Sequence, residues 1–118
     1  MSTDRFRTEP FLPLTPVAFE ILLALAEGEQ HGYRIMQDVN GRAGSPLLHA
    51  GTLYRALARL LEQALIEELD ERPTGRDDER RRYYRLSERG RAVAVAEAQR
   101  LAGQLATARA RRLVGVLP

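Results

Sequence analysis

Apolar residues recur at the helical period near the start of the chain. Thr15 and Pro16 are typical of a helix start, because a hydroxyl can cap free amides and proline suits the first helical position. Gly28 is typical of a helix end. The apolar residues between these positions are Val17, Ile21, Leu22 and Leu25, with Phe19 and Leu23 widening the surface. The pattern predicts a largely buried first helix.

A second, shorter helix is predicted after His31 and Gly32, with Asn40 and Gly41 ending it and a loop over 41–49. The residues expected along one of its sides are Tyr33, Met36 and Val39. We expect Tyr33 to pack in the core and His31 to bond at the start of the helix.

The third predicted helix, over 51–63, has the cleanest two-sided pattern in the chain. Its core side is formed by Leu53, Leu57, Leu60 and Leu61. At about 100° per residue, the opposite side carries Thr52, Arg55, Arg59 and Glu62, with the small Ala56 and Ala58 beside them and Tyr54 on the flank. Because nothing bulky and apolar lies there, this face points at water or at a polar ligand.

Two short segments, 65–70 and 81–86, space apolar residues by two and predict the strands of a β-hairpin with a long loop. Pro73, Thr74 and Gly75 begin the connection, and a charged tip follows. Two strands alone are marginally stable in water, so the hairpin must lean on the helices. We expect Tyr84 to pack inward and the alternating Tyr83 to face out.

The last predicted helix follows Ser87 as its cap and runs over 88–114. At 1.5 Å per residue it is about 40 Å long, which exceeds the roughly 30 Å diameter of a body of this size. A seam with alternating steps of four and three is formed by Ala94, Ala98, Leu101, Leu105 and Ala108. A second copy of the chain would cover this stripe, so we expect a homodimer. The alternative is a helix that folds back at Gly103 over its own core.

Composition excludes several kinds of chemistry. The chain has 118 residues, no Cys and no Trp, and its 18 basic residues are all Arg. Disulfides, thiolate nucleophiles, cysteine metal sites and lysine nucleophiles are therefore excluded. No apolar run approaches the roughly 20 residues that cross a bilayer, which favours the cytoplasm. Residues 72–91 hold eight Arg, whereas residues 62–71 hold five acids and no Arg. A locally basic stretch suggests an anionic partner met at one place, although a solvated charge run has the same pattern.

The order of elements is that of a winged helix-turn-helix: helix, short helix, loop, two-sided helix and basic hairpin. We predict a mostly α-helical fold with a small β-hairpin, in which 13–87 form a DNA-binding domain and 88–114 a dimerisation helix. The third helix can enter the major groove of double-stranded DNA while the hairpin touches the backbone. The residues expected to contact DNA are Thr52, Tyr54, Arg55, Arg59, Arg76, Arg80, Arg81, Arg82, Tyr83 and Arg85.

Seven short motifs in order make the chain similar to the PadR-type transcriptional regulators over residues 13–113. They are His31-Gly32-Tyr33, Gly51-Thr52-Leu53-Tyr54, Leu57, Arg59-Leu60-Leu61-Glu62, Leu65-Ile66, Arg82-Tyr83-Tyr84-Arg85-Leu86-Ser87 and Gly90. The resemblance implies a winged-helix repressor of the short-tailed kind that dimerises through its C-terminal helix. It also implies a response to a small organic effector, such as a phenolic acid or a drug.

Three positions depart from the family pattern. Arg55 stands where many relatives have Pro, which exchanges a helix-initiating ring for a potential DNA contact. His49-Ala50 stands where Pro-Gly is common, and Ala64 where Gly usually ends the helix. A positive φ at Ala64 would store about 1 kcal/mol of strain. Without Trp, the aromatic sandwich that some relatives use for flat drugs cannot be carried over.

Other roles for the polar residues fit the sequence less well. His31 and His49 with Glu27 or Glu29 lack the spacing of a metal site. The acids Glu67, Glu68, Asp70, Glu71, Asp77, Asp78 and Glu79 are better explained as partners of neighbouring Arg than as catalytic carboxylates. We therefore expect neither an enzyme nor a cofactor. The alternative function is a winged-helix module that binds an acidic protein instead of DNA, and a third possibility adds an apolar effector pocket between the dimer's first and last helices.

Overall fold

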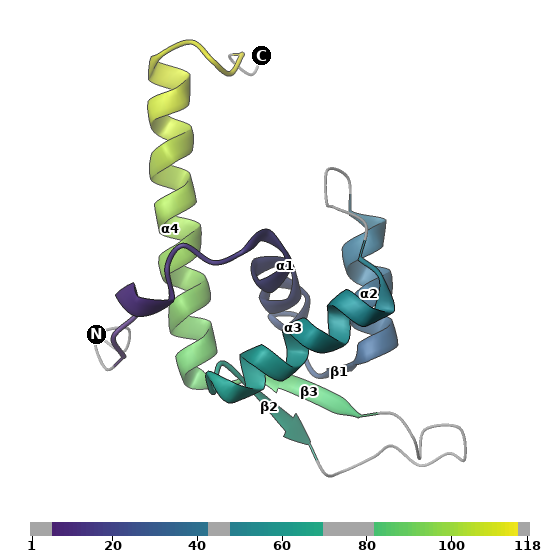
Figure 1. The fold of residues 1–118 in the computed structure, drawn as a ribbon. Coiled ribbons are helices and arrows are strands. Elements are labelled where there is room, and N and C mark those ends of the chain that lie inside the picture. The colour runs from purple at the N-terminus through teal and green to yellow at the C-terminus, as the bar shows by residue number, and fades with distance from the viewer. Residues whose placement is uncertain (1–5, 43–47, 70–81, 116–118) are drawn as a thin grey trace.

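The computed structural model describes residues 6–42, 48–69 and 82–115, and these form four α-helices, one short 3-10 helix and a small sheet (Figure 1). The prediction of a mostly helical fold is confirmed. The elements are η2 (Glu9–Phe11), α1 (Pro16–Leu25), β1 (Gln30–His31), α2 (Gly32–Gly41), α3 (Ala50–Glu62), β2 (Ile66–Leu69), β3 (Tyr83–Leu86) and α4 (Glu88–Ala110).

The predicted caps begin three of the helices. The hydroxyl of Thr15 accepts a hydrogen bond from the backbone N–H of Ala18 at 3.1 Å, as expected for α1. At α2 the Nδ1 atom of His31 accepts from the N–H of Arg34 at 3.2 Å. At α4 the Ser87 hydroxyl accepts from the N–H of Gly90 at 2.9 Å. Each cap satisfies an amide that has no partner inside its helix.

One core lies between α1, α2, α3, the sheet and the first half of α4 (Figure 1). Its fully buried large side chains include Ile21, Leu22, Ile35, Leu53, Leu57, Leu60, Leu65 and Ile66. Tyr84 is buried as predicted. The prediction for Tyr33 is wrong, because 54% of that residue is exposed. It precedes the buried Ile35 by two residues, about 200° around the helix, and therefore lies on the outer side of α2.

The sheet has three strands rather than the predicted two, in the order β1-β3-β2, and all pairings are antiparallel. The hairpin of β2 and β3 is confirmed, with Glu67 opposite Arg85 and Ile66 opposite Leu86. The additional strand, β1, pairs Gln30 with Tyr84 at the other edge of β3. A two-residue strand has too little alternation to be recognised in a sequence.

Ala64, which stands where the family usually has Gly, follows the end of α3 in a left-handed conformation. The N–H of Leu65 donates to the carbonyl of Leu60, and the N–H of Ala64 donates to that of Leu61, both at 3.0 Å. This pair of bonds is a Schellman motif, which requires a left-handed residue at the position of Ala64. The φ of Ala64 is 61°, so the residue takes the strained conformation that glycine adopts freely.

Helix α4 is continuous through Gly103, so the alternative of a helix that folds back is wrong. It ends at Ala110, four residues before the predicted end. Arg112 has φ 63°, and the N–H of Leu113 donates to the carbonyl of Ala108 at 2.8 Å, which closes the last turn. The molecule measures 54 × 33 × 24 Å, and α4 extends well beyond the core (Figure 1).

Replacing Ala64 with Gly should stabilise the fold. Relief of the left-handed strain exceeds the entropy that glycine adds to the unfolded chain, so we expect the free energy of unfolding to rise by about 0.5–1 kcal/mol. Ala58→Gly, an exposed change inside α3, is the matched control and should lower it by about 1 kcal/mol. Chemical denaturation of both variants measures the difference. Equal destabilisation by the two changes would contradict this account of the α3 terminus.

Candidate nucleic-acid interface

The outer face of α3 carries two exposed arginines, Arg55 and Arg59, beside a half-buried Thr52. The opposite face of the helix packs Leu53, Leu57 and Leu60 into the core. The two-sided pattern predicted from the sequence is therefore present. Apolar packing on the inner face holds α3 in place. The guanidinium groups of Arg55 and Arg59 therefore lie on the outer face, where a partner can reach them.

The Arg55 side chain turns back toward the start of α3. Its Nη2 atom lies 3.5 Å from the Thr52 hydroxyl, and its Nη1 atom lies 3.5 Å from the position that a Cβ on Gly51 would occupy. Long helical side chains lean toward the N-terminus in this way. The arrangement places a planar, bidentate hydrogen-bond donor at the end of the helix that leads into the groove in helix-turn-helix complexes.

Tyr54 joins the two helices of the helix-turn-helix. A Cβ on Gly32 would lie only 2.8 Å from the Tyr54 hydroxyl, so the ring lies directly against the start of α2. About half of the Tyr54 surface remains exposed. A side chain at the glycine of the His31-Gly32-Tyr33 motif would therefore displace the tyrosine ring of the Gly51-Thr52-Leu53-Tyr54 motif.

The turn that sets α3 against α2 is held by Asn40. Its Oδ1 atom accepts from the N–H of Leu48 at 2.7 Å, and its Nδ2 atom donates to the carbonyl of Leu48 at 3.0 Å. Arg42 adds a tie to α1 by donating to the carbonyl of Glu20 at 3.0 Å. The sequence analysis identified Asn40 only as the end of a helix. Its hydrogen-bonding partner, Leu48, lies beyond a loop, and no sequence pattern links the two residues.

The arginines of the strands are paired with acids. Arg85 donates to Glu67 at 2.8 Å, and Arg82 donates to Glu68, which raises the pKa of the Arg82 guanidinium. The expectation that these acids serve neighbouring arginines is confirmed for Glu67 and Glu68. Both pairs are solvent-exposed, so each stabilises the fold little and can exchange its acid for another anion.

Strand alternation puts the two arginines on different faces of the sheet. Arg82 shares its face with Tyr84, which packs toward the core beside α3. Burial and then the charge of Glu68 raise the pKa of the Tyr84 phenol. Arg85 and Tyr83 share the other face, where the Tyr83 ring meets the His31 ring edge-on at 5.3 Å. Tyr83 is half-buried by this contact.

The remaining predicted DNA contacts, Arg76, Arg80 and Arg81, lie outside the described residues. The structure thus brings Thr52, Arg55 and Arg59 together on one helix face and sets Arg82 on the sheet face nearest to that helix. Arg85 and Tyr83 are separated from this group by the sheet.

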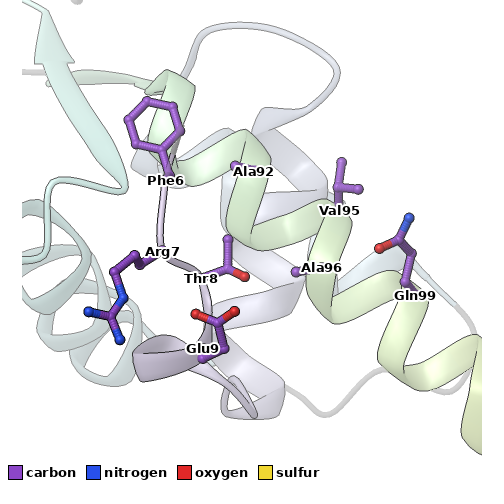
Figure 2. Close-up of a pocket in the computed structure, with 8 residues that line it drawn as sticks. All are labelled: Phe6, Arg7, Thr8, Glu9, Ala92, Val95, Ala96 and Gln99. Carbon is purple, nitrogen blue, oxygen red and sulfur yellow. The ribbon is translucent and has the colours of Figure 1, made fainter. Parts of the chain in front are cut away.

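A groove of about 520 Å³ runs along the first half of α4 (Figure 2). Residues 6–9 form one wall and α4 the other. The residues that line it are Phe6, Arg7, Thr8, Glu9, Ala92, Val95, Ala96 and Gln99. This groove differs from the predicted effector pocket, because its second wall is the segment that precedes α1 and not α1 itself.

The predicted seam of α4 divides into two parts. Ala94 is partly buried against the core of its own chain, because the first turns of α4 belong to that core. Ala98, Leu101 and Leu105 are exposed and Ala108 is half-exposed. Only this outer part of the seam is open to a second copy.

The described ranges contain neither a cluster of metal-ligating side chains nor a helix suited to span a membrane. Residues 6–42, 48–69 and 82–115 contain no group of three or more metal-ligating side chains. None of the helices in these ranges has the length and apolar character needed to cross a bilayer.

Three helices, a basic helix face and a short antiparallel sheet define a winged helix-turn-helix protein. The sequence profile of the transcriptional regulator PadR-like family matches residues 21–96, so the chain belongs to that family of DNA-binding regulators. No curated protein matches the chain.

Solved structures agree with this assignment. A PadR family transcription regulator from hypervirulent Clostridium difficile is 25% identical with a TM-score of 0.72, and the match covers 80% of this chain and 96% of that one. A transcriptional regulator from Clostridium thermocellum is also 25% identical, with a TM-score of 0.65 and coverage of 84% and 90%. The RosR protein of H. salinarum, at 23% identity, a TM-score of 0.66 and coverage of 80% and 79%, shares the fold.

Glu68→Gln should strengthen binding to any duplex. Loss of the carboxylate frees Arg82 for a phosphate, so we expect affinity at low salt to rise up to about fivefold and the salt dependence to steepen by about one ion. Fluorescence anisotropy over a salt series measures both quantities. Glu27→Gln, an exposed change of the same charge at the end of α1, is the control. A Glu68→Gln titration that overlays the control at every salt concentration would show that Arg82 does not reach DNA.

Proposed function

We propose that this protein is a homodimeric repressor that binds specific sequences of double-stranded DNA and is released by a small organic effector. The observation that carries the proposal is the outer face of α3, where Arg55 and Arg59 are exposed and no bulky apolar side chain stands between them. We place the protein in the cytoplasm with its DNA and assign it no catalytic activity.

In the proposed complex α3 enters the major groove. Arg55 and Arg59 can each hold a guanine edge or a phosphate by two hydrogen bonds, and the small Ala58 beside them allows a close approach. Arg82, at the start of β3, contacts the phosphate backbone after exchanging Glu68 for it. The DNA-binding head comprises residues 13–87, and Tyr54 orients α3 in it while exposing half of its own surface.

The dimer forms through the outer part of α4. Leu101 and Leu105 are among the exposed large hydrophobic side chains of the molecule, and Ala98, Ala102 and Ala106 beside them allow a second helix to approach closely. Two such heads would read two half-sites, in keeping with the two-fold symmetry of most homodimers.

We place the proposed effector in the groove along α4, whose lining combines the aromatic Phe6 and the aliphatic Val95 with the charged Arg7 and Glu9 (Figure 2). Release of bound operator DNA by a planar aromatic compound would support this part of the proposal. If no compound in a broad panel of such compounds releases the DNA, this part of the proposal fails.

A module that binds an acidic protein is the second candidate, since an exposed arginine face suits any polyanion. Affinity for double-stranded DNA distinguishes these two candidate functions. A DNA-binding protein binds random duplex at low salt, where nonspecific attraction is strongest, and a protein-binding module does not.

Arg55→Ala and Arg59→Ala should each reduce discrimination between the selected operator and random duplex by about 1–3 kcal/mol, because each removes a bidentate contact. The operator is first selected by the wild-type protein from a random library, and affinities are measured at about 0.15 M salt. Arg109→Ala, which removes the same charge from the far end of α4, should leave discrimination unchanged. Wild-type protein that binds its selected operator no better than random duplex would overturn the proposal.

Leu105→Glu should convert the dimer to monomers, because it places two charges in an apolar seam. Sedimentation equilibrium should give about twice the chain mass of 13.3 kDa for the wild type and the chain mass for the variant. Arg111→Glu, an exposed charge change just beyond the helix, is the control and should remain dimeric. A monomeric wild type at all concentrations would exclude α4 as a dimer contact.

A further inference from the structure

The outer side of α2 exposes an aromatic residue that the function proposed above does not use. Tyr33 is 54% exposed, more than any other aromatic residue in the described ranges, and Tyr54 follows at 52%. The core of the molecule is built without the Tyr33 ring. Its phenol is therefore accessible to a partner.

Two contacts identify the side of α2 that borders α3 (Figure 1). At the start of α2, the Tyr54 ring of α3 covers Gly32, because a Cβ at that glycine would lie 2.8 Å from the Tyr54 hydroxyl. Near the end of α2, Asn40 makes two hydrogen bonds with Leu48, which lies two residues before the start of α3. Gly32 and Asn40 thus mark the side of α2 that adjoins the DNA-binding helix.

Tyr33 lies at the exposed margin of this side. It precedes Asn40 by seven residues, so the two side chains leave the helix within about 20° of each other. Gln37, one turn after Tyr33, is also exposed and neighbours it on the helix surface. Together with Tyr54, these residues form a surface at the junction of α2 and α3. We call the surface of Tyr33, Gln37 and Tyr54 the tyrosine edge.

The two charged residues of α2 serve other parts of the molecule. Asp38 lies 3.5 Å from the Nη2 atom of Arg42, which also donates to a backbone carbonyl of α1. Arg34 lines a pocket together with Glu27 and Glu29, which lie between α1 and β1. The tyrosine edge itself carries only hydroxyl and amide groups, so no carboxylate on it repels a polyanion.

Hydroxyl and amide groups at this place suit the DNA backbone. In helix-turn-helix complexes the second helix enters the major groove while the first helix crosses the backbone. Here α2 is the first helix and α3 the second, and the tyrosine edge lies where the two adjoin. Tyr and Gln side chains are among those that hydrogen-bond phosphate oxygens in protein–DNA complexes.

We propose that Tyr33, Gln37 and the hydroxyl of Tyr54 bind a phosphate group of the DNA backbone at the border of the groove that α3 enters. The inference rests on the proposed function, because it concerns the same protein–DNA complex. The two hydroxyls and the amide donate hydrogen bonds to the phosphate oxygens. Since a phosphate is the same beside every base pair, this contact positions α3 without reading sequence.

The tyrosine edge differs from the arginines in how its contribution depends on salt. An arginine that neutralises a phosphate releases condensed counterions, so its contribution to affinity falls as the salt concentration rises. An uncharged donor neutralises no phosphate and leaves this salt dependence unchanged. The affinity contributed by the tyrosine edge therefore persists at salt concentrations that weaken the arginine contacts.

Tyr33→Phe tests the contact, because it removes one exposed hydroxyl and keeps the ring. We expect affinity to fall about fivefold for the selected operator and equally for random duplex, since one hydrogen bond to the backbone is lost. The slope of log affinity against log salt concentration should stay at the wild-type value. Fluorescence anisotropy with the purified full chain measures these quantities. Gln37→Leu should behave in the same way, and Gln104→Leu, the same change on the exposed far part of α4, should bind as the wild type does.

A second measurement identifies the phosphate. Operator duplexes are made with an uncharged methylphosphonate in place of one phosphate at a time. At the contacted position, the replacement should weaken binding by the wild type about fivefold more than binding by Tyr33→Phe, because the variant has already lost that hydrogen bond. At the other positions the two proteins should lose affinity equally.

Three results would overturn the inference. They are wild-type affinity of Tyr33→Phe for both duplexes, a loss confined to the operator, which would indicate a contact with a base, and equal losses in the two proteins at every methylphosphonate position. If wild-type protein itself binds no duplex at low salt, the proposed function fails instead.

Discussion

The carbonyl oxygen of Leu65 is the point on which the arrangement of this molecule depends. It accepts a hydrogen bond from the N–H of Ser87 at 3.1 Å, and a Cβ on Gly90 would lie 1.8 Å from it. Leu65 follows α3 and precedes β2, whereas Ser87 and Gly90 follow β3 and open α4. One close backbone contact therefore fixes α3, the β2–β3 hairpin and α4 to one another. No residue with a side chain could replace Gly90 without separating them.

Electrostatics in the wing moderates the attraction to polyanions. A chain with 18 arginines and a local surplus around the hairpin would bind any duplex strongly, but Glu67 and Glu68 occupy two of those arginines. In the proposed complex a phosphate would have to displace the Glu68 carboxylate to reach Arg82. The pairing would therefore lower the part of the affinity that comes from sequence-independent phosphate contacts.

Local chemistry made much of this fold predictable. The hydroxyl and imidazole caps, the apolar face of α3 and the alternation of β3 depend on neighbours within a few residues, and all were read from the chain. The features that were missed depend on distant contacts. Gln30 forms a strand only because Tyr84 pairs with it, Tyr33 turns outward because Ile35 takes the core, and Asn40 acquires its role from Leu48 across a loop. Glu97 was not singled out from the sequence, because nothing in its spacing reveals that its side chain is buried.

The length of α4 beyond the core affects how dimer formation would depend on the concentration of the protein in a cell. The exposed stretch from Ala98 to Ala110 is about 20 Å long and, as a helix of about 10 Å diameter, presents by itself much less than the ~800 Å² per partner of a standard interface. In the proposed dimer, a contact of that size would dissociate as the protein is diluted, so assembly and operator binding would be linked equilibria. Occupancy of a site for two heads would then rise with the square of the monomer concentration, and a modest change in expression would give a sharp change in occupancy.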